Sequence, residues 1–317
     1  MNFYITTPIY YTNDLPHIGH CYTSIACDII ARYNKLLGND VFFLTGTDEH
    51  GQKVEKAAIK SNLKPKDFVD KLSLNFVKLI PFLGCEIDDF IRTTEDRHIK
   101  ASQALWKKLE NNNQIYLSNY EGWYSVRDEA YYSENELKNV NGKFVTENGS
   151  PVEWVKEESF FFKLSEWQDK LIKHYENNPD SILPKTRYNE VLSFIRGGLK
   201  DLSISRTTFN WGVPVPNNSK HVMYVWIDAL CNYLTAIGYP DTKNKNYSKF
   251  WPATHIVGKD ILRFHAVYWP AFLMAADIEP PKRIFAHGWW TNEGQKISKS
   301  IGNVIDPYEI INKFGLD

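Results

Sequence analysis

The sequence predicts an α/β fold in which a doubly wound parallel sheet is split in two by an inserted domain. Residues 3–45 read strand, amphipathic helix, strand, and units of this kind place their two strands in parallel. Residues 254–258 and 283–288 are short apolar runs separated by a helical pattern, which predicts a second such unit. The stretch between these units is rich in Tyr and alternates apolar with polar residues, as small antiparallel sheets do.

The first unit is the clearest. "FYITT" (3–7) and "VFFLT" (41–45) are strand-like apolar runs. Between them, apolar residues recur at steps of three and four from Ile18 to Leu37, which predicts a helix that ends at Gly38. Residues 65–83 and 95–113 have helical periodicity, and a single helix is expected from about 259 to 276.

The predicted organisation is a split Rossmann-type fold. Its expected parts are residues 1–114 (first half of the nucleotide-binding domain), 115–222 (insertion), 223–290 (second half) and 291–317 (a cationic loop and the start of a helical segment).

Composition excludes several classes of protein. The chain has 37 basic and 38 acidic residues, so a nucleic-acid partner would need a local basic face. No apolar stretch approaches the roughly 18 residues that span a bilayer, and we expect no membrane partner and a cytoplasmic location. The four cysteines form no C-x-x-C pair, so the sequence predicts no zinc ligand set.

"PHIGH" (16–20) occupies the first strand-to-helix turn, at the edge of the sheet where ligands bind. His17 and His20 lie about one helical turn apart, and helix N-termini favour anions. Gly19 has no side chain, so a base or ribose could approach the backbone. We interpret this turn as a phosphate site.

"GTDEHGQK" (46–53) resembles a P-loop but lacks its Lys and its Ser or Thr at the required positions. The carboxylates of Asp48 and Glu49 would repel a triphosphate and suit an ammonium group. A metal site formed by His17, His20, Asp48 and His50 is a weaker alternative, because the H-E-x-x-H spacing is missing.

"QKISKS" (295–300) places two lysines and two serines in six residues. A lysine can stabilise charge on a transferring phosphate. Alone, this run would be an ordinary solvated loop. With "HIGH" in the other half of the chain, it indicates a nucleotide-dependent enzyme.

Together, "HIGH" (17–20) and "KISKS" (296–300) resemble the signature motifs of the class I aminoacyl-tRNA synthetases, with Ile297 in place of the usual Met. Five further stretches are similar to the methionyl-tRNA synthetase family: "TTPIYYTNDLPHIGH", "FLTGTDEHGQKVEKAA", "YVWIDAL", "IVGKDILRFHAVYWPA" and "HGWW". They span nearly the whole chain.

The resemblance implies a methionine–tRNA ligase and assigns residues. The implied catalytic residues are His17, His20, Lys296 and Lys299. The implied ATP-binding residues are His17, Gly19, His20, Lys259, Asp260, Lys296, Ser298 and Lys299. The implied methionine-binding residues are Ile9, Tyr11, Asp48, Arg206, Trp226, Ala229, Tyr233, Phe264, His265 and Trp269. Asp48 would hold the ammonium group, and Arg206 would lie near the carboxylate.

The implied reactants are methionine, ATP with Mg²⁺, and the acceptor end of tRNA(Met). Residues 115–222 correspond to the family's connective-peptide domain, but Ser125 and Asp128 stand where a zinc-binding C-x-x-C pair would fall, so we expect no zinc. The family's anticodon-binding domain is expected to be absent, and adenylation to be the main activity. The alternatives are a synthetase for Cys, Leu, Ile or Val, and a truncated non-catalytic paralogue that binds methionine or its adenylate.

Overall fold

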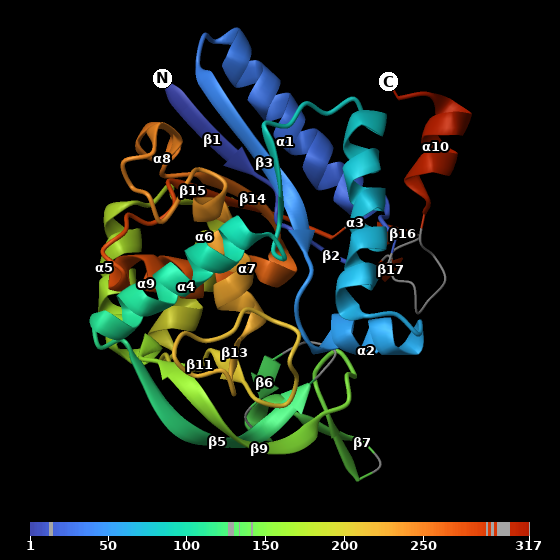
Figure 1. Ribbon diagram of the computed structural model, residues 1–317. Coiled ribbons are helices and arrows are strands. Elements are labelled where there is room, and N and C mark those ends of the chain that lie inside the picture. The colour runs from blue at the N-terminus through green and yellow to red at the C-terminus, as the bar shows by residue number, and fades with distance from the viewer. Residues whose placement is uncertain are drawn as a thin grey trace.

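The structure is a computed structural model that describes residues 1–12, 15–125, 130–132, 134–140, 142–289, 291–292, 295–296 and 305–316. Within these residues the main sheet has seven strands, all paired in parallel (Figure 1). They are β1 (Asn2–Thr6), β2 (Tyr10–Tyr11), β3 (Asp40–Asp48), β4 (Asp89–Arg92), β10 (Ile182–Leu183), β14 (Thr254–Gly258) and β15 (Arg283–His287).

Helices cover both faces of this sheet (Figure 1). The helices of the described residues are α1 (Ile18–Leu36), α2 (Gln52–Lys60), α3 (Pro65–Phe82), α4 (Asp96–Asn111), α5 (Gln168–Asn177), α6 (Lys185–Arg196), α7 (Val225–Thr235), α8 (Lys245–Phe250), α9 (Trp269–Ala275) and α10 (Pro307–Phe314). The doubly wound α/β fold predicted from the sequence is therefore confirmed.

The strand order contains one reversal. The sheet runs β10-β15-β14-β1-β3, and β2 and β4 both pair with β3. In the first half of the chain, β3 is added on one side of β1. In the second half, β15 is added to β14 on the opposite side. Crevices at such reversals, outside the carboxyl ends of the strands, are where ligands bind in open α/β sheets. A ligand site is therefore expected beyond Thr6 of β1 and Gly258 of β14.

The alternation of side chains divides the core into two layers. Tyr4, Phe42 and Leu44 belong to the large cluster that includes residues of α4, α7 and α9. Ile5 and Phe43, at alternate positions, pack instead against Cys27 and Ala31 of α1. Both faces of β1 and β3 are thus buried, as parallel sheets require.

The inserted segment forms a separate antiparallel sheet of order β11-β9-β5-β6. Its strands are β5 (Ile115–Ser125), β6 (Ala130–Tyr132), β9 (Glu153–Phe162) and β11 (Leu202–Ser203), and the hairpin of β7 (Lys138–Val140) and β8 (Lys143–Val145) lies beside them. A two-stranded link, β12 (Ser205–Arg206) with β13 (Val222–Met223), leads back to α7.

Residues 115–222 are not spatially one unit, however. Ile182 and Leu183 of β10 pair with Ile284 and Phe285 of β15, so part of the predicted insertion completes the edge of the main sheet. A two-residue strand has no periodicity to detect, so this pairing could not be predicted from the sequence. The limits 1–114, 115–222, 223–290 and 291–317 are therefore proposed as divisions of the sequence and not as separate units in space.

The helical segment predicted from about 259 to 276 is present, but it is not a uniform α-helix. The chain forms a 3₁₀ turn (Lys259–Ile261), a π-type turn (Phe264–Tyr268) and then α9. Pro270 has no N–H to give the carbonyl of Ala266, which accepts a hydrogen bond from the Tyr175 hydroxyl instead (2.5 Å).

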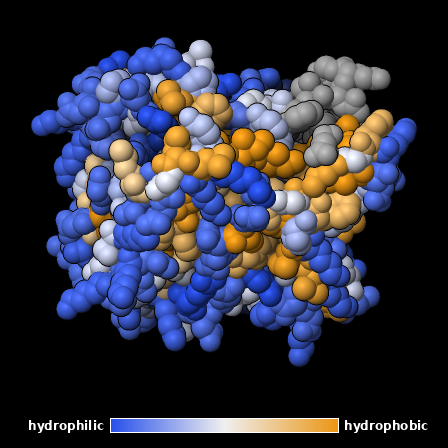
Figure 2. Space-filling model, turned by 90° about the horizontal axis from the view of Figure 1, so that it is seen from above, coloured by the Kyte–Doolittle hydropathy of each residue, from blue (hydrophilic) through white to orange (hydrophobic). Residues whose placement is uncertain are grey.

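One face of α1 is apolar and exposed. Ile29, Tyr33, Leu36 and Leu37 are each more than half exposed. Figure 2 shows apolar surface gathered across the middle of the molecule when it is seen from above, bordered by hydrophilic side chains.

Among the described residues, no helix is long and apolar enough to cross a membrane.

Candidate active site

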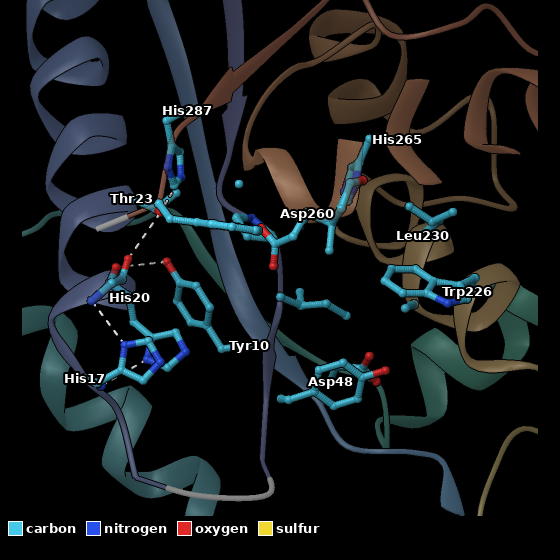
Figure 3. A pocket seen from close by; sticks show the side chains of 18 of the residues that line it. Tyr10, His17, His20, Thr23, Asp48, Trp226, Leu230, Asp260, His265 and His287 are labelled. Atoms are coloured by element: carbon cyan, nitrogen blue, oxygen red, sulfur yellow. Dashed lines mark hydrogen bonds between the residues drawn. The ribbon is translucent and has the colours of Figure 1, made fainter. Parts of the chain in front are cut away.

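A cavity of about 380 Å³ lies at the reversal of strand order (Figure 3). Side chains from the segment after β1, the start of α1, the end of β3, α7, and the turns after β14 and β15 line it. In Figure 3, His17 and His20 lie on one side, Trp226 and His265 lie on the other, and Asp48 lies below them. This is the position that the sheet topology predicts for a ligand.

The two histidines of "HIGH" cap the first turn of α1. The His17 Nδ1 atom accepts a hydrogen bond from the Gly19 backbone N–H (3.1 Å), and the His20 Nδ1 atom accepts one from the His17 N–H (3.0 Å). The two rings stack with their centroids 3.9 Å apart. This reciprocal arrangement satisfies two N–H groups that a helix start otherwise leaves unpaired.

The capping bonds also fix the ring proton. A ring whose Nδ1 accepts a hydrogen bond carries its proton on Nε2 when it is neutral. Both Nε2 atoms are therefore donors, at the positive end of the α1 dipole, which suits an anionic ligand. A Cβ atom on Gly19 would come within 2.9 Å of the His17 ring, so this glycine is needed for the ring's position.

Of the three charged or titratable residues in "GTDEH", only Asp48 lines the cavity. The Glu49 carboxylate is fully buried and forms two hydrogen bonds with the guanidinium of Arg92 (2.7 and 3.0 Å). The His50 ring binds Asp228 (2.5 Å). The loop therefore presents one carboxylate to the cavity, and the expectation that Glu49 also suits an ammonium group there is corrected: Glu49 is paired with Arg92.

The opposite wall is aromatic and apolar. Trp226 lines the cavity and stacks on Phe264 with the ring centroids 3.5 Å apart and the planes 6° from parallel. His265 Nδ1 lies 2.9 Å from the Ile261 carbonyl, which can only accept, so Nδ1 carries the proton. Its Nε2 consequently accepts from the Tyr233 hydroxyl (2.8 Å). Burial lowers the pKa of His265 to about 4, which keeps this wall neutral.

The structure brings most of the predicted site residues together. Those that line the cavity are Ile9, Tyr11, His17, Gly19, His20, Asp48, Trp226, Ala229, Tyr233, Asp260 and His265. Phe264 lies behind Trp226, and Trp269 is fully buried with its ring centroid 6.2 Å from that of Tyr233. Of the cationic loop, the structure describes only the backbone of Lys296, in the short strand β17 (Gln295–Lys296), while Ser298 and Lys299 lie outside the described residues.

Two predicted residues point elsewhere. Lys259 places its ammonium group 3.9 Å from the centroid of the Trp289 ring, at the rim of the cavity. Arg206 does not line the cavity. Its buried guanidinium donates to Ser203 Oγ and to the carbonyl of Ser205 (both 2.8 Å), and lies 3.5 Å from a carboxylate oxygen of Glu157.

We expect Arg206→Met to lower the free energy of unfolding by about 3–5 kcal/mol, because it strands the buried charge of Glu157. Urea denaturation measures this. Unchanged stability in Arg206→Met would contradict this structural role of the pair with Glu157.

Sequence reasoning missed nine cavity residues: Pro8, Tyr10, Thr23, Leu230, Gly258, Ile261, His287, Gly288 and Trp289. Thr23 Oγ1 lies 3.0 Å from His287 Nε2, across 264 residues of sequence. Strand β15 ends beside β14, and this is the signal that could have placed "HGWW" at the same sheet edge.

The whole chain resembles one protein family. The sequence model of the family described as tRNA synthetases class I (M) matches residues 3–317. The chain belongs to this family.

The similarity extends over almost the whole chain. It is 65% identical to a methionine–tRNA ligase of Rickettsia prowazekii and 58% identical to one of Mesorhizobium japonicum, each over 99% of this chain and 61% of the relative. The chain thus spans about three fifths of the length of the curated relatives it matches.

Solved structures agree. The Mycobacterium tuberculosis methionyl-tRNA synthetase in complex with methionyl-adenylate superposes with a TM-score of 0.97 at 52% identity, over 99% of this chain and 62% of that one. The apo form of that protein superposes with a TM-score of 0.85 at 48% identity, over 99% of this chain and 60% of that one. These matches confirm the Rossmann-type catalytic fold.

Because two buried histidines, His255 and His265, are neutral in the fold, we expect its stability to depend on pH. Burial lowers the pKa of His265 to about 4 and that of His255 well below its usual value. Between their ordinary pKa of about 6.5 and these lower values, the unfolded chain binds more protons. The free energy of unfolding should therefore fall as pH drops below 6.5, by up to about 1.4 kcal/mol per pH unit for each histidine.

Urea denaturation at pH 7 and pH 5 measures the effect. His265→Gln should lose less stability across this interval than the parent chain, and an equal loss would show that His265 is not neutral in the fold.

Proposed function

We propose that this chain activates L-methionine with ATP to form methionyl-adenylate and pyrophosphate. The observation that carries the proposal is one cavity with a buried carboxylate and an aromatic wall on one side, and two imidazole donors at a helix N-terminus on the other. The first half suits an amino acid with an apolar, polarizable side chain, and the second suits phosphate.

The reaction needs no general base, because the methionine carboxylate is ionised at pH 7. A carboxylate oxygen forms a bond to the α-phosphorus of ATP, and the bond from that phosphorus to the bridging oxygen breaks, so that the electron pair leaves with pyrophosphate. Catalysis then consists of positioning and of stabilising charge.

The chain's residues divide this work. Asp48 binds the ammonium group, and Trp226, Ala229, Tyr233 and His265 surround the thioether. His17 and His20 donate their Nε2 protons to the phosphates. Asp260 approaches the ribose from the turn after β14. By resemblance, Lys296, Ser298 and Lys299 close over the leaving pyrophosphate.

ATP enters with Mg²⁺ held by its own phosphates. The described residues contain no group of three or more His, Cys, Asp or Glu that could hold a metal ion. The absence of zinc stays a prediction: elemental analysis should find well under one zinc per chain, and stoichiometric zinc after dialysis would contradict it.

Transfer to tRNA is a further part of the proposal. The 3′-terminal ribose of tRNA(Met) would attack the adenylate carbonyl and release AMP. The match with the Rickettsia prowazekii relative covers 61% of that protein, so about two fifths of its length lies outside the matched part. A cytoplasmic location is also proposed.

Amino-acid-dependent ATP–pyrophosphate exchange tests the proposal. Methionine should support exchange, while Cys, Leu, Ile and Val should not. Exchange with another of these amino acids would change the substrate. If the folded protein shows none, it is a non-catalytic paralogue.

A further inference from the structure

A buried cluster of two histidines and one carboxylate lies behind the cavity and takes no part in the proposed chemistry. The side chains of Asp228 and His98 are fully buried, and His50 is 4% exposed. None of the three lines the cavity. Because a buried charge is costly unless it is fully bonded, a cluster in this position calls for an explanation.

The cluster joins three separate elements. The two carboxylate oxygens of Asp228 (α7) lie 2.5 Å from His50 Nδ1, in the loop after β3, and 2.6 Å from His98 Nε2, in α4. Burial alone raises the pKa of Asp228, but the two histidines outweigh it and lower the pKa to about 2. An ionised carboxylate only accepts, so both rings donate to it. His98 is fixed in turn by Ser102 Oγ and Thr235 Oγ1, each 3.2 Å from a ring nitrogen.

Each linked element carries a wall of the cavity. Asp48 stands two residues before His50, and Trp226, Ala229 and Leu230 flank Asp228 on α7. The bond between His50 and Asp228 therefore connects the carboxylate of the cavity to its aromatic wall.

The loop is also held from its other side. Trp211 donates its indole N–H to the Glu49 carbonyl (2.5 Å), and its own carbonyl accepts from the Gly51 N–H (2.9 Å). The Trp211 ring lies edge to face with His50, with centroids 5.5 Å apart. With both sides fixed, the bond to Asp228 determines how far Asp48 stands from α7.

We propose that Asp228, with His50 and His98, is a positioning residue that sets the spacing between the ammonium-binding carboxylate and the thioether wall. This inference rests on the proposed function. A role in stability alone would be met as well by apolar packing, since buried ionic groups are often neutral to stability when replaced together. A fixed spacing instead needs directional bonds.

The test measures equilibrium binding of L-methionine and of a non-hydrolysable ATP analogue by calorimetry. His50→Ala removes the donor, and His50→Asn keeps an N–H near the position of Nδ1. We expect His50→Ala to weaken methionine binding by about tenfold or more, with the analogue within about twofold of the parent chain. His50→Asn should restore methionine binding to within about threefold.

His221→Ala is the matched control. His221 is also fully buried and bonded, to Ser205 Oγ (3.0 Å) and to Glu158 (3.3 Å), but it lies away from the cavity. It should lower the melting temperature without changing methionine affinity.

The outcomes separate the two proposals. If the parent chain does not bind methionine, the proposed function fails. If the parent chain binds and a folded His50→Ala binds equally well, or loses both ligands alike, the positioning role is overturned. Should His50→Ala not fold, His98→Leu and His98→Gln replace it. Weaker methionine binding by His98→Leu together with near-parent binding by His98→Gln would support the positioning role. Methionine binding by His98→Leu equal to that of the parent chain would overturn it.

Discussion

Asp48→Asn should weaken methionine binding by about 10²-fold. The Asp48 carboxylate is 3% exposed and faces an apolar wall, so its attraction to an ammonium group is poorly screened by water. Asn keeps the size of the side chain but removes the charge. The methionine KM in pyrophosphate exchange measures the loss, and the ATP KM should change only a few-fold.

Asp70→Asn is the control for this experiment. Asp70 is a partly exposed carboxylate that pairs with Arg92 (2.5 Å) outside the cavity. It should leave both KM values unchanged. If Asp48→Asn loses ATP binding while methionine still binds, "GTDEHGQK" is a phosphate loop and the assignment of the two halves of the cavity is reversed.

The second large effect concerns His17, whose ring has two separable roles. Its Nδ1 caps α1, and its Nε2 is the atom proposed to donate to phosphate. Asn is a good N-cap residue and can replace Nδ1 as the acceptor, but it has no group in the place of Nε2. His17→Asn should therefore keep the melting temperature and lower kcat for adenylation by about 10²–10³-fold.

His17→Ala completes the comparison, because it removes both roles. It should lose the same activity and also about 0.5–2 kcal/mol of stability from the missing cap. Full activity in His17→Asn would show that this histidine is a structural cap only.

The sequence was sufficient to predict what depends on local pattern. The strand 254–258 and the helix that begins at Ile18 lie where periodicity placed them. The cavity residues His17, His20 and Asp48 were recognisable because each lies in a short motif at the end of a strand or the start of a helix, where topology brings ligand sites.

What the sequence could not supply is the pairing of charges far apart in the chain. Glu49 and His50 sit beside Asp48 in one motif, yet their partners, Arg92 and Asp228, are 43 and 178 residues away. Composition and spacing carry no information about such partners, so the sequence could not show that Glu49 and His50 are bonded away from the cavity. The same is true of Arg206, whose charge is paired with Glu157.

We propose that one cavity holds methionine on the side of Asp48 and the nucleotide on the side of His17 and His20. A crystal structure with a non-hydrolysable methionyl-adenylate analogue tests it most directly. We predict that the ligand's amine lies within hydrogen-bond distance of Asp48, its thioether against Trp226 and Tyr233, and its phosphate against the two histidine Nε2 atoms. An analogue bound in the opposite orientation, or bound outside this cavity, would contradict the account.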